Sequence, residues 1–170
     1  MAPETGGNNR KVGNRKMKWL ILPLILFSLV TTHADESISV EKLKALANAD
    51  NLIENLRAGD KVFVYFWASW CPECREKLSG DLQRLQANYP KFKFITVNAD
   101  RDPAKGLLFA ESEKLKLPIY RDDDKSLTKS LKLFAVPAWA VLEKSQAGTW
   151  QARMASTGAD LASIEIELRK

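Results

Sequence analysis

The chain of 170 residues has little of what most catalytic and metal sites are built from. It contains two cysteines and a single histidine, His33. Two cysteines are too few for a disulfide-stapled small protein or for a four-thiolate zinc site. One histidine excludes a histidine-rich metal cluster. We therefore expect no metal and no bound cofactor. A hydrophobic share of 45% and a charged share of 28% are ordinary for a globular protein, which excludes a disordered tail and a polytopic membrane protein.

The excess of positive charge lies almost entirely at the N-terminus. The net charge is +5, yet residues 1–34 contain five basic residues and one acidic residue, whereas the rest of the chain contains 21 basic and 20 acidic residues. A nearly neutral body has no electrostatic footprint for nucleic acid, so we expect no nucleic-acid partner.

Residues 1–34 are arranged like a secretory leader. A basic stretch is followed by the apolar run 19–30, and small residues at Thr32 and Ala34 precede an acidic pair. As a helix the apolar run would span roughly 18 Å, short of the ~30 Å hydrocarbon core of a bilayer. This favours cleavage after Ala34, with His33 removed, over a membrane anchor through residues 19–30. Met17 is an alternative start. Residues 35–170 are the predicted folded domain, and we expect it to work outside the cytoplasm.

Segments typical of helices and strands alternate along residues 35–170. An unbroken apolar run of strand-forming residues predicts a buried strand at 62–67, and the apolar residues within 92–97 predict a second. A hairpin is predicted from a strand at 138–142 and, by its alternation with polar residues, a strand at 150–154. Helical spacing predicts helices over 37–56, 74–89 and 102–115, another from 122 through Phe134, and a last one after Gly158. This order predicts an α/β layer sandwich.

The chemistry is concentrated in one motif, WCPECR at residues 70–75, where the first buried strand turns into a helix. Cys71 lies at the helix start, where unpaired N–H groups and the helix dipole favour a thiolate. Cys74 lies one turn on and can attack a mixed disulfide formed on Cys71. A covalent haem site needs a histidine where position 75 has arginine, and a structural disulfide closing so short a loop would stabilise little. The motif therefore predicts a redox-active dithiol, with Cys71 attacking and Cys74 resolving.

The motif and its surroundings resemble the thioredoxin superfamily. Residues 66–75, FWASWCPECR, look like its active-site segment. Residues 117–124, LPIYRDDD, and 134–138, FAVPA, resemble the secreted branch typified by TlpA and ResA. The resemblance covers about residues 37–170. It implies a thioredoxin-like three-layer sandwich, with helices flanking a mixed central sheet and a strand–helix insert in mid-domain.

The resemblance also implies how a client is bound. Pro137 corresponds to the cis-proline that faces the cysteines in the family, although the residues alone leave an ordinary trans-proline at a strand start equally open. A cis bond would present the N–H and C=O of Val136 to an extended client strand. Trp70 would contact partners, so the expected substrate-binding residues are Trp70, Val136 and Pro137.

Two positions depart from the family's pattern and affect proton transfer. The buried acid that thioredoxins place six residues before the nucleophile is Tyr65 here, and the glutamate often found three residues after the second cysteine is Lys77. Proton transfer to and from Cys74 is then open to Glu73, Glu76 or water. Glu73 also fits as an ordinary acidic residue in the first turn of a helix.

These observations predict an exported thiol–disulfide oxidoreductase that reduces client proteins. In a bacterium it would work in the periplasm with a membrane thiol–disulfide electron donor, and the resemblance suggests cytochrome c biogenesis. A carboxylate between the cysteines disfavours a thiolate, which favours reduction, with a potential of about −200 mV or below. A binding or chaperone module and a disulfide-forming oxidase are the alternatives. A peroxidase usually has threonine where position 68 is alanine.

Overall fold

The computed structural model describes residues 1, 3, 38–49 and 51–170. The predicted leader, apart from residues 1 and 3, lies outside the described residues. The chain divides into two units, Met1–His33 and Ala34–Lys170, and the fold below is that of the second. None of the described helices is long and apolar enough to cross a membrane.

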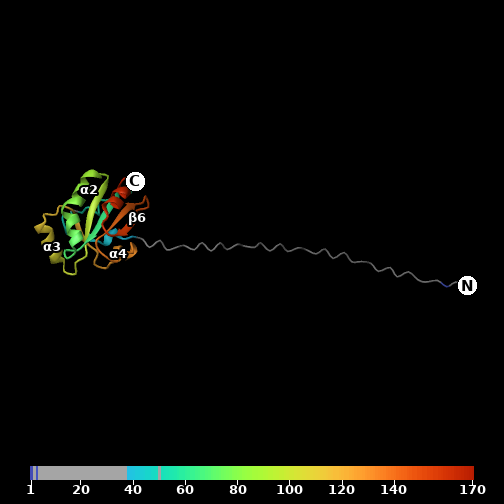
Figure 1. The fold of residues 1–170 in the computed structure, drawn as a ribbon. Helices are drawn as coiled ribbons and strands as arrows, with labels where there is room; N and C mark the ends of the chain where they lie inside the picture. Colours follow the sequence, from blue (N-terminus) through green and yellow to red (C-terminus); the bar gives the residue numbers. More distant parts are fainter. Residues whose placement is uncertain (2, 4–37, 50) are drawn as a thin grey trace. The chain divides into compact units, whose positions relative to one another are not determined.

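Six strands form one mixed sheet in this unit (Figure 1). In chain order they are β1 (Lys44–Ala47), β2 (Lys61–Trp67), β3 (Phe92–Asn98), β4 (Ile119–Arg121), β5 (Ala138–Lys144) and β6 (Trp150–Thr157). Their order across the sheet is β1-β4-β3-β2-β5-β6. Strands β2, β3 and β4 run parallel, whereas β1, β5 and β6 pair antiparallel with their neighbours. The central strands β2 and β3 are the two buried strands that the sequence predicts at 62–67 and 92–97.

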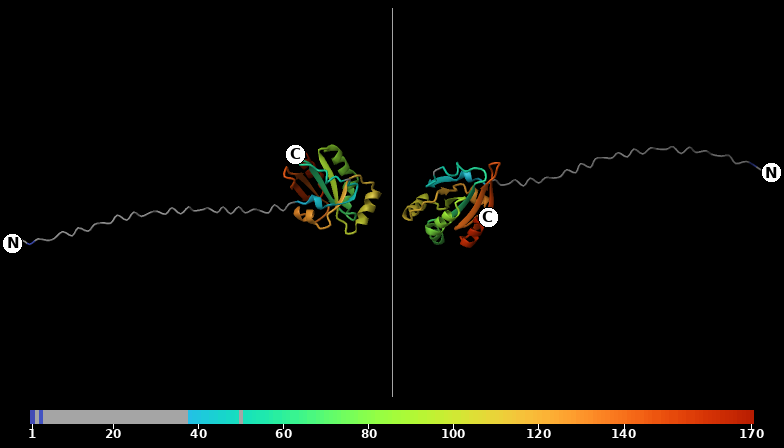
Figure 2. Two further views of the ribbon diagram at one scale, coloured as in Figure 1. Left: turned by 180° about the vertical axis from the view of Figure 1, so that it is seen from behind. Right: turned by 90° about the horizontal axis from the view of Figure 1, so that it is seen from above.

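Helices cover both faces of this sheet. They are α1 (Pro72–Glu76), α2 (Leu82–Asn88), α3 (Pro103–Ser112), α4 (Ser126–Ser130) and α5 (Leu161–Leu168), with a short 3₁₀ turn at Val40–Lys42 and a π-helical turn at Lys77–Asp81 joining α1 to α2. The edge-on view in Figure 2 shows α2 and α5 on one side of the sheet and the N-terminal segment on the other. The three layers predicted from the resemblance are therefore confirmed.

Alternate side chains of β2 build two separate cores. Phe63, Tyr65 and Trp67 pack on the side of α2, α3 and α5. Val62, Val64 and Phe66 pack on the other side, against α4 and the segment before β2. Both faces of β2 are covered, which explains why its sequence is apolar without alternation. Cys71 follows the C-terminal end of β2, so both cores hold in place the strand that leads to the cysteine pair.

The prediction of a helix over residues 37–56 is wrong. A 3₁₀ turn is followed there by strand β1, which pairs with β4 through Lys44 with Arg121 and Ala45 with Tyr120. Local spacing fitted a helix, but pairing with a strand far along the chain decides the conformation. The mid-domain strand β4 is only three residues long and gave no periodic signal, although the resemblance implied it.

Two further helices differ from their predicted extents. The helix expected from residue 122 is confined to α4, and Phe134 lies beyond it with 88% of its surface exposed. The single helix expected over 74–89 is interrupted by the π-helical turn. Helices α3 and α5 lie within the predicted segments. The hairpin strands β5 and β6 begin at the predicted residues and extend beyond the predicted ends.

Candidate active site

The two cysteines are joined by a disulfide at the start of α1, with their Cα atoms 5.3 Å apart. Cys71 is the N-cap residue, Pro72 occupies the first turn, and the Sγ atom of Cys71 accepts the backbone N–H of Cys74 at 3.2 Å. The sulfur of Cys71 is thus placed where the helix offers a donor and the positive end of its dipole, which suits a thiolate. Cys74 is fully buried and Cys71 retains 4% exposure.

The Val136–Pro137 peptide bond is cis, the isomer that the resemblance implied. Pro137 immediately precedes β5, whose first residue Ala138 pairs with Phe66 near the end of β2. This register sets the proline beside the strand that leads to the disulfide. Among the described residues, no hydrogen bond reaches the N–H or C=O of Val136, so both groups are open to an added strand.

Trp70 and Val136 line one groove, although they lie 66 positions apart in the chain. Trp70 is 68% exposed and directly precedes Cys71. The structure therefore brings the predicted substrate-binding residues and the cysteine pair to one edge of the sheet. Large exposed aromatic side chains at such a place mark interaction surfaces.

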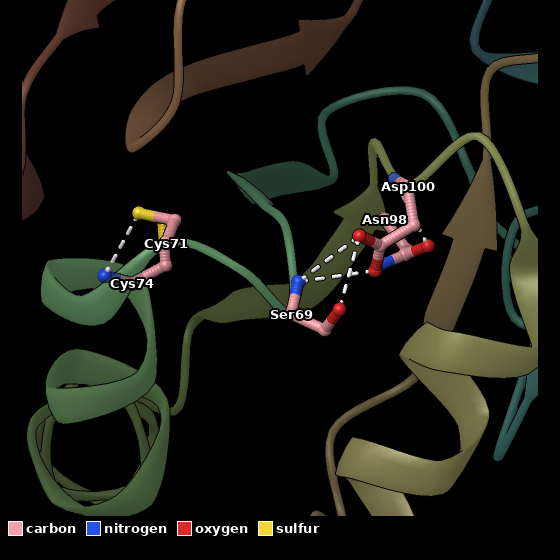
Figure 3. Close-up of a disulfide and its surroundings, with 5 residues drawn as sticks. All are labelled: Ser69, Cys71, Cys74, Asn98 and Asp100. Atoms are coloured by element: carbon pink, nitrogen blue, oxygen red, sulfur yellow. Dashed lines mark hydrogen bonds between the residues drawn. A yellow bond between two sulfur atoms is a disulfide. The ribbon is translucent and has the colours of Figure 1, made fainter.

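A buried carboxylate that the sequence analysis missed holds the loop before the disulfide (Figure 3). Asp100 is 4% exposed and accepts the backbone N–H of Ser69 at 3.0 Å, the Ser69 hydroxyl at 3.1 Å and the side-chain amide of Asn98 at 2.8 Å. Asn98 ends β3, so the network ties the loop after β2 to the neighbouring strand. The signal in the sequence was polar residues directly after a buried strand, because the carboxyl ends of adjacent parallel strands meet at one edge.

Helix α3 closes the other side of this network. A Cβ atom on Gly106 would lie 2.7 Å from the side chain of Asn98, so only glycine lets the helix approach this closely. Arg75 of α1 in turn lies over the ring of Phe109 in α3, 5.2 Å from its centroid. Helix α3 thus contacts both Asn98, which bonds the Asp100 carboxylate, and the helix that follows Cys71.

The predicted proton-relay residues lie on the surface. Glu73 and Glu76 are exposed on α1, whereas Cys74 is buried, so the structure does not bring either carboxylate to that sulfur. Lys77, at the position often occupied by glutamate, pairs with Asp81 at 3.1 Å.

Tyr65 replaces the buried acid of thioredoxins with a neutral group. Its side chain is fully buried, and its hydroxyl has no hydrogen-bond partner among the described residues. Burial raises the pKa of the Tyr65 phenol, and the negative charges of Glu73 and Asp81 raise it further. Tyr65 therefore stays protonated and cannot act as a base for Cys74. Among the described residues there is also no cluster of side chains that could hold a metal ion.

Comparisons with known proteins agree with this geometry. Residues 35–156 match the family model described as Redoxin. Thioredoxin-like protein YneN of Bacillus subtilis is 25% identical over 146 residues, which cover 75% of this chain and 84% of that protein. Sporulation thiol-disulfide oxidoreductase A of the same organism is 28% identical over 107 residues, covering 60% and 63%. Thiol-disulfide oxidoreductase ResA of Bacillus thuringiensis is 24% identical over 148 residues, covering 77% and 83%.

Solved structures share the fold. The crystal structure of StoA from Bacillus subtilis superposes with a TM-score of 0.54 at 25% identity, covering 67% of this chain and 85% of that one. The N-terminal domain of PilB from Neisseria gonorrhoeae has a TM-score of 0.59 at 21% identity, covering 81% and 91%, which shows likeness of fold alone.

Proposed function

The chain belongs to the Redoxin family and is a thiol–disulfide oxidoreductase, and from this premise we propose that it reduces disulfides of client proteins outside the cytoplasm through Cys71 and Cys74. The observation that carries the proposal is the place of Cys71 at the start of α1, where its sulfur accepts an N–H. Exposed Trp70 directly precedes Cys71, and the cis-proline directly precedes the strand that pairs with β2. The open N–H and C=O of Val136 support an extended client segment as substrate.

The reaction transfers two electrons from the dithiol of the enzyme to the disulfide of the client. The Cys71 thiolate attacks one sulfur of the client disulfide, forming a mixed disulfide and releasing a client thiolate, which takes up a proton. The Cys74 thiol then loses its proton, for which Glu73, Glu76 and water are the candidate acceptors. Its thiolate attacks the Cys71 sulfur, and the second client thiol leaves as the Cys71–Cys74 disulfide forms. The client is reduced and the enzyme oxidised, so each turnover requires a dithiol donor.

The direction of electron flow follows from the charges around the cysteines. Glu73 lies between them and disfavours a second negative charge, whereas the helix start favours one. No histidine is present there to stabilise the thiolate more strongly. We expect a potential of about −200 mV or below, nearer to the roughly −270 mV of thioredoxin than to the roughly −120 mV of a strong oxidant.

Export and the electron donor complete the proposal. The arrangement of residues 1–34 supports an exported enzyme, periplasmic in a bacterium, with the leader either removed or retained as an anchor. A protein of low potential in an oxidising compartment cannot stay reduced unaided, which supports a membrane thiol–disulfide donor. Among clients, the resemblance to the TlpA and ResA branch supports the thiol pair of apocytochrome c.

Equilibration of the protein with glutathione buffers, with scoring of Cys71–Cys74 oxidation, measures the potential. A value above about −150 mV would favour disulfide formation and contradict the reductase proposal. Insulin reduction with dithiothreitol separates an enzyme from a binding or chaperone module, because the module would give no turnover beyond that of a Cys71→Ser control. N-terminal sequencing of protein from its native compartment tests the leader, with Asp35 expected as the first residue.

A further inference from the structure

The groove lined by Trp70 and Val136 combines apolar walls with a cationic edge. It has a volume of about 480 Å³ and runs from Trp70 and Val136 to α4. Phe66, Val97 and Leu133 line it with side chains that belong to the core on the α4 side of the sheet. Its volume falls in the range of roughly 300–1,000 Å³ typical of sites that hold small ligands or side chains.

Exposed aromatic side chains border the groove. Phe134, 88% exposed, and Trp70, 68% exposed, both contribute to its lining. Leaving such rings in water forgoes the free energy of burial, at about 25 cal/mol for each Å² of apolar surface. A client segment that covers them would recover part of this free energy. The groove therefore suits a large apolar side chain rather than a small polar ligand.

The charge at the groove is positive on the α4 side. Lys125 and Lys129 line it and are both exposed. Asp122 lines it too, but its carboxylate is buried and accepts the N–H and hydroxyl of Thr128. No carboxylate of the described residues lies within ion-pair distance of Lys125, and the amine of Lys129 reaches only the backbone carbonyl of Asp124, at 3.4 Å. The groove lining therefore contains two exposed lysines and one acidic residue, Asp122, whose carboxylate is hydrogen-bonded within the protein.

A second hollow, lined by Trp70, contains two basic and two acidic residues, so its formal charge is balanced. Arg101 and Lys105 line it and are exposed. Its acids are Asp100, which is bound in the Ser69 network, and Asp102, which caps α3 through the N–H of Ala104 at 3.0 Å. The excess of positive charge near Trp70 is therefore confined to the groove with Lys125 and Lys129.

We propose that this groove selects the client: it binds an extended, cysteine-containing protein segment that places a large apolar side chain against Phe66, Val97 and Leu133 and a carboxylate near Lys125 and Lys129. Charge complementarity carries the proposal, together with two chain neighbours of the redox site in the groove lining: Trp70 directly precedes Cys71, and Val136 directly precedes the cis-proline Pro137. Residues next to a client cysteine held at Cys71 can therefore reach the groove. The inference rests on the proposed function and specifies its substrate class.

The test uses the full-length reduced protein and a panel of synthetic peptides. Each peptide carries one cysteine and is supplied as the symmetrical disulfide dimer, with Phe or Ala beside the cysteine and Asp or Asn near it. The second-order rate of reduction is followed by chromatography of the released thiol. Division by the rate with dithiothreitol removes each peptide's intrinsic reactivity.

In the unaltered protein at low salt, Phe should raise the normalised rate about tenfold over Ala. Asp should raise it about fivefold over Asn, which corresponds to roughly 0.5 kcal/mol for each lysine. The Lys125→Gln/Lys129→Gln variant should lose the preference for Asp and keep that for Phe. A matched control is Lys114→Gln/Lys116→Gln, since these lysines are exposed before β4, at the opposite edge of the sheet, and Lys114 shares the positive φ of Lys125 (50° and 59°).

Three results would overturn the proposal. In the unaltered protein, the preference for Asp over Asn could fall below twofold. It could also persist in the Lys125→Gln/Lys129→Gln variant, or be lost to the same extent in the Lys114→Gln/Lys116→Gln control. A Phe-to-Ala ratio near one would remove the apolar part. Failure of the proposed function is recognised separately, because the reduced protein would then also fail to reduce the neutral bis(2-hydroxyethyl) disulfide, which makes no use of the groove.

Discussion

Replacement of Asp100 by alanine should release the loop that carries the disulfide. The carboxylate accepts three donors: the Ser69 amide at 3.0 Å, the Ser69 hydroxyl at 3.1 Å and the Asn98 side-chain amide at 2.8 Å. Ser69 is half-buried, so its hydroxyl can turn to water, and two donors are left unpaired. A hydrogen bond to a charged acceptor contributes roughly 1.5–3 kcal/mol, and relief of the carboxylate's own desolvation offsets part of this. The free energy of unfolding should therefore fall by about 2–4 kcal/mol.

The conservative variant Asp100→Asn should lose about 1–2 kcal/mol, because it keeps one carbonyl acceptor but presents an NH₂ group to donors. Both variants should remain folded, since domains of this kind have roughly 5–15 kcal/mol of stability. Urea unfolding followed by circular dichroism gives the free energies, and hydrogen exchange of the Ser69 amide, read by NMR, reports the loop directly. In Asp100→Ala this amide should exchange much faster than the amides of β2.

Asp102→Ala is a suitable control, because Asp102 lies in the same connection but caps α3 and does not touch Ser69. It should lose about 1 kcal/mol and leave exchange at Ser69 unchanged. If Ser69 stays protected in Asp100→Ala, or if the loss is below about 1 kcal/mol, Asp100 does not hold the loop.

Three further predictions concern single groups. Cys71→Ser should abolish disulfide exchange, and Cys74→Ser should accumulate mixed disulfides that are visible on non-reducing gels. If a limiting amount of alkylating reagent modifies Cys74 before Cys71 in the reduced protein, the two roles are assigned the wrong way round. Tyr65→Phe should raise the free energy of unfolding by about 1 kcal/mol in urea titrations, since it removes a buried hydroxyl that has no partner in the described structure, and a loss of stability would reveal a partner. The N–H and hydroxyl of Ser163 hold the pKa of Asp160 below its usual value, so Asp160→Ala should destabilise the protein above about pH 4. That difference should vanish as the pH falls through the lowered pKa, and equal destabilisation at pH 7 and pH 2 would contradict it.

The sequence predicted best those elements whose signal is local. Strand β2 is a continuous apolar run after Lys61, and β3 is apolar at four of its seven positions. The dithiol motif carries its own chemistry in six consecutive residues. Strand β1 was missed because its conformation depends on β4, which follows it by more than 70 positions in the chain. The spacing of Val40, Leu43 and Ala47 fits a helix, and no local property of the sequence distinguished a helix from a strand there.

The residues of the site could be predicted only where their own chemistry or sequence context indicates a role. The isomer at Pro137 depended on the resemblance, because cis and trans X–Pro bonds differ by only about 0.5–1 kcal/mol intrinsically. Asp100 was missed because its only signal, a polar residue directly after a buried strand, is shared by aspartates with many ordinary roles. Glu73 and Glu76 were candidates for proton transfer because they lie close to the cysteines in the sequence. Both are exposed on α1.

The π-helical turn at Lys77–Asp81 determines where this part of the chain can change length. A π turn holds one residue more than the α-helix on either side of it requires. Deletion of Gly80, where a Cβ atom would meet open space, would convert it into a regular turn and leave Leu78 and Leu82 facing the core. The same deletion inside α2 would rotate every later side chain by about 100° and turn Leu85 out of the core. Length variation is thus absorbed at this turn, and the cysteine-bearing start of the helix can be exchanged between proteins without repacking its second half.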